Sequence, residues 1–234
     1  MTDRPNDRPD DGPARTLGDL VVPRRPADVP YEDGADHDAR ALLTENGYTT
    51  DPGELMEVLD SDLDVLRAAA ARTLGAQREH DAVDSLARLA SDGTVEETVR
   101  VQAAYALARM DVPRGREVLV ALLDLPFEAS PAPSQAAGAL ARLGDPRGFS
   151  VVSAALDSPN RVTAMVACKQ LYAFVPLHGD LLPDDSGVDR VDAYDLFERA
   201  LERPEAAVAE EARVQLEAVD GDRADALLEA YPPR

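Results

Sequence analysis

The chain has 234 residues, a length that fits one ordinary domain or a short repeat array whose core needs no metal or disulfide. Aromatic residues make up 4% of the chain and Trp is absent, whereas Ala and Leu are abundant, which favours closely packed helices over a β-sheet. Cys168 is the single cysteine, which excludes an intramolecular disulfide and a cysteine-rich zinc site.

The formal net charge of −21 weighs against nucleic acids and anionic membranes as partners, because both require a basic protein surface. The sequence contains no run of about 18 apolar residues and no signal-peptide pattern. We therefore expect a cytoplasmic protein with no nucleic-acid partner and no membrane partner.

The chain divides into two parts by composition. Residues 1–36 are rich in Pro, Asp and Arg and are expected to form a mostly disordered tail. Residues 37–234 are expected to form a solenoid with an acidic loop inserted at 176–192, because apolar segments of helical period alternate there with Gly, Pro and Asp. In chain order, the predicted helices are 38–46, 53–59, 64–76, 81–90, 97–110, 115–124, 134–143, 146–156, 160–175, 193–202, 205–219 and 223–231.

The second part of the chain repeats itself at an interval of 33 residues. The segment Leu107–Met110 followed by Pro113–Gly115 recurs as Leu140–Leu143 followed by Pro146–Gly148, and Leu74 precedes Leu107 by the same interval. Each unit contains two helical segments separated by a short polar break. The predicted fold class is therefore all-α, an α-α superhelix of about five helix pairs.

Three segments carry a family resemblance: Leu-Ala-Arg-Leu-Gly-Asp-Pro-Arg-Gly at 140–148, the run Leu66–Ala71, and Val99-Arg100 followed by Ala103-Ala104. Together they resemble the HEAT-like repeat first named in phycobilisome lyases, over roughly residues 38–231. The resemblance implies a solenoid of HEAT-like helix pairs whose concave surface, formed by the second helices, holds another protein. For Arg67, Arg100 and Asp145 it implies a structural role in tying successive turns together.

The same resemblance leaves other functions open. A minority of such proteins are bilin lyases or chaperones, and HEAT-like DNA glycosylases share the architecture. The glycosylase alternative requires a basic groove and aromatic residues that hold a base, and this sequence is poor in both.

No catalytic signature emerges from the residues that usually carry chemistry. His37, His80 and His178 are far apart and form no metal-binding motif, and no Gly-rich phosphate loop is present. Cys168 lies on the apolar face of its predicted helix and is interpreted as a core residue. We expect no catalytic residue, no metal site and no cofactor.

A concave surface remains as the candidate site. If Leu74, Leu107 and Leu140 point inward, the 33-residue interval aligns three exposed columns on the second helices: Ala69, Gln102 and Gln135; Arg72, Tyr105 and Gly138; Ala76, Arg109 and Arg142. The next second-type helix adds Lys169 or Gln170, depending on its register. The candidate partner-binding residues are Arg72, Gln102, Tyr105, Arg109, Gln135, Arg142, Lys169 and Gln170.

Arg and Tyr are enriched at protein–protein hot spots. The sequence therefore predicts a monomeric, non-enzymatic scaffold or adaptor that binds a protein or peptide on its concave face. The alternative interpretation of the same columns is an ordinary solvated helix surface.

Overall fold

A computed structural model of the chain describes residues 16–22, 31–177 and 191–233. Over these residues the chain forms twelve α-helices and no β-strand, so the predicted all-α solenoid is confirmed. Most of the predicted disordered tail, most of the predicted acidic loop and His178 lie outside the described residues. None of the described helices is both long enough and apolar enough to cross a membrane.

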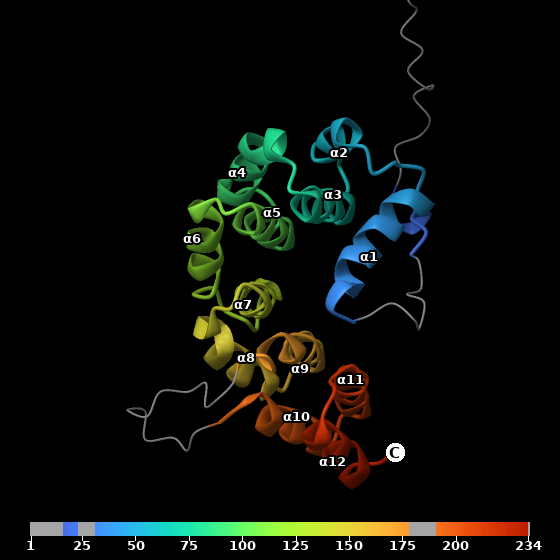
Figure 1. The fold of residues 1–234 in the computed structure, drawn as a ribbon, viewed down its shortest axis with the longest axis vertical. Helices are drawn as coiled ribbons and strands as arrows, with labels where there is room; N and C mark the ends of the chain where they lie inside the picture. The colour runs from blue at the N-terminus through green and yellow to red at the C-terminus, as the bar shows by residue number, and fades with distance from the viewer. Residues whose placement is uncertain (1–15, 23–30, 178–190, 234) are drawn as a thin grey trace, which may run out of the picture.

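The odd-numbered and even-numbered helices take different places in the solenoid. The odd-numbered helices α3 to α11 line the inner side of an arc, the even-numbered helices form its outer side, and α1 lies across the open side (Figure 1). The odd-numbered helices are α1 (Tyr31–Glu45), α3 (Asp64–Gln77), α5 (Glu97–Arg109), α7 (Ala132–Arg142), α9 (Arg161–Cys168) and α11 (Ala206–Leu216). The even-numbered helices are α2 (Pro52–Val58), α4 (Val83–Ser91), α6 (Pro113–Leu122), α8 (Phe149–Leu156), α10 (Ala193–Glu202) and α12 (Asp222–Ala230).

Four short 3₁₀-helices complete the described elements, namely η1 (Leu17–Asp19), η2 (His80–Ala82), η3 (Pro146–Gly148) and η4 (Leu171–Phe174).

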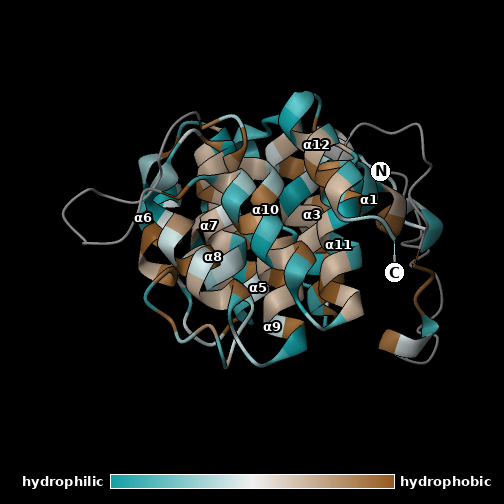
Figure 2. Cartoon of the chain, turned by 90° about the horizontal axis from the view of Figure 1, so that it is seen from below, coloured by the Kyte–Doolittle hydropathy of each residue, from teal (hydrophilic) through white to brown (hydrophobic). Residues whose placement is uncertain are grey.

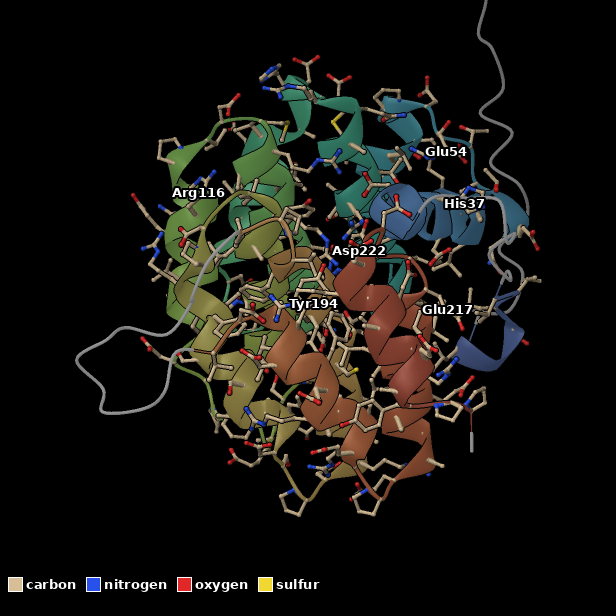
Figure 3. All side chains as sticks on the ribbon, turned by 60° about the horizontal axis from the view of Figure 1, so that its bottom comes forward. His37, Glu54, Arg116, Tyr194, Glu217 and Asp222 are labelled. Carbon is tan, nitrogen blue, oxygen red and sulfur yellow. The ribbon has the colours of Figure 1, made fainter. Side chains whose placement is uncertain are left out.

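Hydrophilic and hydrophobic residues alternate along the ribbons of the helices, as expected where each helix buries only part of its surface (Figure 2). Charged side chains cover the outside of the array, and Arg116 on α6 lies on the opposite edge of the molecule from α1, which carries His37 (Figure 3).

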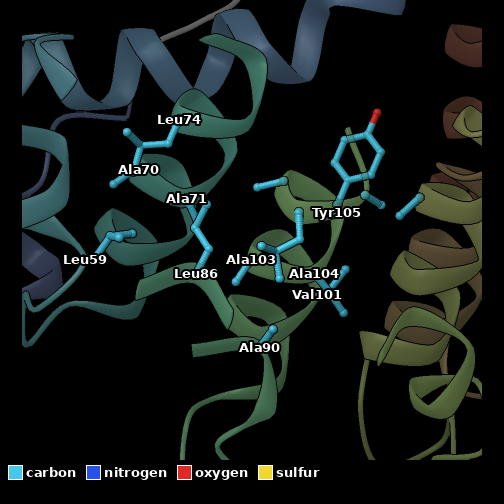
Figure 4. Packing of buried hydrophobic residues seen from close by; sticks show 14 of the residues in the cluster. Leu59, Ala70, Ala71, Leu74, Leu86, Ala90, Val101, Ala103, Ala104 and Tyr105 are labelled. Carbon is cyan, nitrogen blue, oxygen red and sulfur yellow. The ribbon is translucent and has the colours of Figure 1, made fainter. Parts of the chain in front are cut away.

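The core consists of apolar side chains between the two layers. Leu74, Leu107 and Leu140, which the repeat places at equivalent positions, are all 0% exposed. The close-up in Figure 4 shows Leu74 and Leu86 near the small side chains Ala70 and Ala71. Since alanines occupy the buried face of the inner helices, neighbouring backbones approach closely and successive turns stack tightly.

The repeat is also visible in how the inner helices end. Arg78, Asp111 and Gly144 adopt left-handed φ angles of 55°, 61° and 76° just after α3, α5 and α7. In each case the carbonyl of the inward leucine accepts a hydrogen bond from the amide five residues later, as in a Schellman motif: Leu74 from Glu79 at 3.0 Å, Leu107 from Val112 at 3.0 Å and Leu140 from Asp145 at 2.9 Å. One local backbone structure therefore recurs at the sequence period.

Helix α1 ends in the same way, so its C-terminus is equivalent to those of α3, α5 and α7 although it lies across the open side of the arc (Figure 1). Gly47 has a φ of 86°, and the Tyr48 amide donates to the Leu43 carbonyl at 3.0 Å. The helix begins at Tyr31, whereas the sequence pattern placed its start at residue 38. The first residues of α1 are polar and acidic and show no apolar period, so the pattern contained no signal for them.

Part of the segment expected to be disordered contacts the array. The Val21 amide donates to Asn46 Oδ1 at 2.9 Å, and Asn46 Nδ2 donates back to the Val21 carbonyl at 2.8 Å. Leu20 packs against the first core cluster. The short apolar run 20–22 therefore lies beside the end of α1 rather than in the concave surface.

The glycines of the Pro-Arg-Gly segments have a packing function. A Cβ atom on Gly115 would lie 2.4 Å from the Ala104 carbonyl oxygen and 2.5 Å from the Ala108 nitrogen, both on α5. A Cβ atom on Gly148 would lie 2.4 Å from the Cα atom of Ala137 on α7. The repeated glycine is therefore the residue that lets an outer helix begin directly against the backbone of the preceding inner helix.

The helix predicted over 160–175 is not continuous. Helix α9 ends at Cys168, and Leu171–Phe174 form the separate 3₁₀-helix η4. The side-chain Nε2 of Gln170 donates to the Val166 carbonyl at 3.3 Å, which is the acceptor that the Gln170 amide would use in a continuous α-helix. The break leaves Leu171 and Phe174 buried in the second core cluster.

The resemblance implied that Arg67, Arg100 and Asp145 tie successive turns together. Arg67 pairs with Asp64 within α3, and of the three it is Asp145, 4.0 Å from Arg116 on α6, that contacts an earlier repeat. Arg100 Nε donates to the Ala90 carbonyl at 3.4 Å and so connects α5 to the end of α4. Asp145 accepts from the Arg147 amide at 3.2 Å and lies at the N-terminus of η3. The Arg147 guanidinium hydrogen-bonds to Asp145 and holds the pKa of this carboxyl below its ordinary value of 3.8.

We predict that Asp145→Ala lowers the free energy of unfolding by about 1–2 kcal/mol at pH 7, because it removes an N-cap and a charge-assisted pair. A carboxylate whose pKa is lowered by folding stabilises the protein above its unfolded pKa, and this contribution disappears as the pH falls through the folded pKa. The difference between the variant and the wild type should therefore shrink below about pH 4. Urea unfolding of both proteins at pH 7 and pH 3 measures it, and an equal difference at both values would contradict the assignment.

Candidate partner-binding site

A cavity of about 390 Å³ lies between α1 and the inner helices. Seven of the eight residues predicted from the sequence line it. The eighth, Arg109, is not in the lining but binds Asp36, as the lining residue Arg72 does. The cavity is lined by Ala35, Asp38, Arg72, Gln102, Tyr105, Gln135, Ala139, Arg142, Lys169, Gln170, Glu211, Val214 and Gln215. The fold thus brings residues from six segments of the chain together.

One feature of this surface is the Arg–Tyr cluster, formed by Arg72, Tyr105 and Arg109. The guanidinium carbons of Arg72 and Arg109 lie 5.2 Å and 5.6 Å from the centroid of the Tyr105 ring, within cation–π distance. In Figure 4 the Tyr105 ring points away from the labelled alanines of its own helix. Two arginines from successive inner helices therefore share one aromatic ring.

Both arginines of the cluster bind one carboxylate from α1. Arg72 Nε lies 2.7 Å from Asp36 Oδ1, and Arg109 Nη1 lies 2.7 Å from Asp36 Oδ2. The Asp36 side chain is only 14% exposed. These hydrogen bonds are charge-assisted and short, which makes them stronger than bonds between neutral groups.

A second feature is the glutamine row, which consists of Gln102, Gln135, Gln170 and Gln215. These residues come from α5, α7, the turn after α9 and α11, so each of four successive inner segments contributes one amide. Gln102 Oε1 accepts from Arg72 at 3.1 Å, and Gln215 Nε2 donates to Glu211 Oε1 at 2.7 Å. The row places amide groups, which both donate and accept hydrogen bonds, along the concave surface.

Two carbonyl oxygens of the glutamine row make no hydrogen bond to the described part of the chain. Gln135 Oε1 and Gln215 Oε1 are buried without a partner there, and the Gln215 side chain is 2% exposed. A buried acceptor left unpaired costs roughly 1–3 kcal/mol. If either side chain turned toward the cavity, its carbonyl oxygen could accept a hydrogen bond from a ligand without losing one to the described part of the chain.

Gly138 makes room for the neighbouring amide. A Cβ atom at this position on α7 would lie 2.1 Å from Gln170 Oε1, which also accepts from Arg142 Nη1 at 3.4 Å. Lys169 Nζ lies 3.9 Å from Glu211 Oε2 on α11. The cavity wall consequently carries both basic and acidic groups, together with amides.

A second cavity of about 380 Å³ continues from the first. It shares Tyr105 and Arg142 with the first cavity and adds the larger apolar side chains Tyr172 and Leu177. The candidate surface therefore extends along the concave side beyond a single pocket.

Three positions of the predicted columns are less exposed than expected. Ala69 and Tyr105 are 5% and 7% exposed, and Gly138 is also buried. The Gln170 and Arg142 side chains lie against Gly138, and the Arg72 and Arg109 guanidinium groups lie over the Tyr105 ring. The lining residues that the sequence did not predict lie on α1 (Ala35, Asp38), α7 (Ala139) and α11 (Glu211, Val214, Gln215). The sequence also did not predict Asp36, which pairs with Arg72.

The residues considered for chemistry do not converge on this surface. Cys168 is 0% exposed, so its interpretation as a core residue is confirmed, and burial raises the pKa of its thiol. In the described ranges, no three residues among His, Cys, Asp and Glu are grouped so that they could hold a metal ion.

Comparison with known proteins agrees with the helical repeat. Residues 53–129 match the family model described as HEAT repeats, so the solenoid defined above contains HEAT repeats. The comparison with curated proteins gave no match. Among solved structures, a crystal structure of an engineered protein is 18% identical and covers 77% of this chain and 84% of its own, with a TM-score of 0.38.

The match identifies residues 53–129 as HEAT repeats, and helix pairs of the same kind continue after them. Proteins built from such repeats act in general as scaffolds for protein interactions.

Proposed function

We propose that this chain is a non-enzymatic scaffold or adaptor that binds a protein or peptide segment in the cavity between α1 and the inner helices. The observation that carries this proposal is the convergence of the Arg–Tyr cluster and the glutamine row on one concave surface. Arginine and tyrosine are the side chains most enriched at the energetic centres of protein interfaces.

The character of the lining favours a polypeptide over a small apolar ligand. Pockets for small molecules are lined mostly by hydrophobic side chains, whereas here the lining consists mainly of amides and charged groups. A polypeptide backbone offers N–H donors for the unpaired carbonyl oxygens of Gln135 and Gln215 and carbonyl acceptors for the amide nitrogens. The second cavity provides apolar contacts for the continuation of such a segment.

The test is affinity capture from a native cell extract with the full chain and two charge-reversed variants. Arg142→Glu changes a residue that lines both cavities, whereas Arg114→Glu makes the same charge change at an exposed position on the outer helix α6. We expect recovery of a partner to fall by about tenfold or more with Arg142→Glu, in the range of a hot-spot substitution. Recovery with Arg114→Glu should equal that of the wild type.

Equal recovery with both variants, at equal thermal stability, would count against the concave site. If no protein is enriched by any variant, the bilin-lyase-like alternative gains weight, and an absorbance titration with a linear tetrapyrrole tests it directly.

A further inference from the structure

We infer that the Arg–Tyr cluster is a carboxylate-binding site which Asp36 occupies as an internal ligand, and that the partner places an Asp or Glu side chain there in its stead. This inference rests on the proposed function and names the chemistry of the group that the partner presents.

The geometry is that of a receptor for one carboxylate. Each oxygen of Asp36 is bound by a different arginine, and the two arginines come from α3 and α5 of successive repeats. Their side chains are 12% and 26% exposed, so the interaction is partly shielded from water and from salt. Gln102 and the Tyr105 ring also hold the arginines in place, so the cluster is preorganised to bind a carboxylate.

Asp36 lies in the first turns of α1, whereas the residues that anchor the helix to the core lie in its later turns. Ala39 and Leu43 are 8% and 0% exposed and belong to the first core cluster, and the end of α1 is fixed by the left-handed Gly47. The residues before Asp36 include Gly34, which costs about 1 kcal/mol in a helix interior relative to alanine. The first turns of α1 can therefore separate from the cluster while Ala39 and Leu43 remain packed.

Movement of these first turns would enlarge the site. Ala35 and Asp38, the neighbours of Asp36 in the first turns of α1, line the cavity. A partner carboxylate that displaces Asp36 would therefore gain both the arginine pair and the space that this part of α1 occupies. The internal ligand weakens the apparent affinity for the partner, because only the fraction of molecules in which Asp36 has left the cluster can bind it.

The inference is tested with a defined probe and the full chain. The probe is the acetylated, amidated peptide Gly-Ala-Asp-Ala-Gly, compared with its Asn counterpart, and binding is followed by NMR through the side-chain Nε–Hε signals of Arg72 and Arg109. The proteins are the wild type, Asp36→Asn, the matched control Glu45→Gln at an exposed carboxylate of α1 outside the cavity lining, and the double variant Asp36→Asn/Arg109→Gln.

We expect Asp36→Asn to bind the Asp peptide about tenfold more tightly than the wild type, because the competing carboxylate has been removed. Glu45→Gln should bind as the wild type does, and the double variant should lose the gain. Equal binding of the Asp and Asn peptides, an equal gain in the Glu45→Gln control, or no binding to Asp36→Asn would each overturn the inference.

A second measurement covers the case in which Asp36→Asn loosens the whole of α1. In Arg109→Gln, with Asp36 intact, amide hydrogen exchange should become faster at residues 35–38 and stay unchanged at residues 39–45. Faster exchange in both ranges, or in neither range, counts against the inference. The affinity capture separates this inference from the proposed function. If Arg142→Glu no longer captures a partner, but the wild type and Asp36→Asn bind that partner equally, the proposed function stands and the internal-ligand inference fails.

Discussion

Gly115→Ala is expected to lower the free energy of unfolding by roughly 3 kcal/mol, the upper part of the range for overpacking a close contact. The new methyl group would lie 2.4 Å from the Ala104 carbonyl oxygen and 2.5 Å from the Ala108 nitrogen. Both are backbone atoms of α5, so relief requires movement of a whole helix rather than rotation of a side chain. For a chain of this size, the loss corresponds to a melting temperature lower by roughly 6–12 °C.

Gly93→Ala is the matched control. No heavy atom lies within 4 Å of a Cβ built on Gly93, so the same added methyl group meets open space. Its stability should stay within about 0.5 kcal/mol of the wild type, as for ordinary surface substitutions. Thermal unfolding followed by circular dichroism compares the three proteins. If Gly115→Ala melted with the Gly93→Ala control, the proposed reason for the repeated Pro-Arg-Gly segment would be wrong.

Phe174→Ala is expected to cost about 3–5 kcal/mol, the usual range for removal of a fully buried aromatic ring. Phe174 is 0% exposed, and its ring packs edge-on against Phe149 of α8 with a centroid distance of 5.3 Å and an interplanar angle of 64°. The same residue anchors η4, the short helix that follows Gln170. The substitution should therefore also loosen the glutamine row.

Phe127→Ala provides the comparison, because Phe127 is only partly buried against the second core cluster. We expect it to cost about 1 kcal/mol, the centre of the distribution for single substitutions. Urea unfolding gives both values, and hydrogen exchange at residues 169–174 reports on η4. Equal losses for the two variants, or unchanged exchange in Phe174→Ala, would contradict the anchoring role of Phe174.

The local features of the fold were predictable because they depend on residues close in sequence. The apolar period placed α10 at Ala193–Glu202, as observed, and placed α3 and α5 to within one residue at their ends. The inward direction of Leu74, Leu107 and Leu140 followed from the same period, and all three are fully buried. The break after Cys168 was missed, because it depends on where the Gln170 side chain finds an acceptor.

The candidate site was predictable only in part. The 33-residue interval identified residues of α3, α5 and α7 that line one cavity, because equivalent positions of a repeat face the same side. Gln215 and Glu211 on α11 could not be aligned in this way, since the segment after residue 176 interrupts the interval. Asp36 lies in an acidic run in which no spacing distinguishes one aspartate from its neighbours.

By itself, the sequence determined a helical repeat protein, the direction of its buried leucines and the row of Arg, Tyr and Gln side chains, because helix formation and side-chain direction follow from local periodicity. Only the tertiary structure decided that the array curves far enough for α1 to reach both Arg72 and Arg109. It also decided that this contact turns an exposed row into a cavity with its own bound carboxylate. The physical reason is that curvature accumulates from the packing of whole helices, and ion pairs between residues 36 or 73 positions apart arise only once that packing is complete.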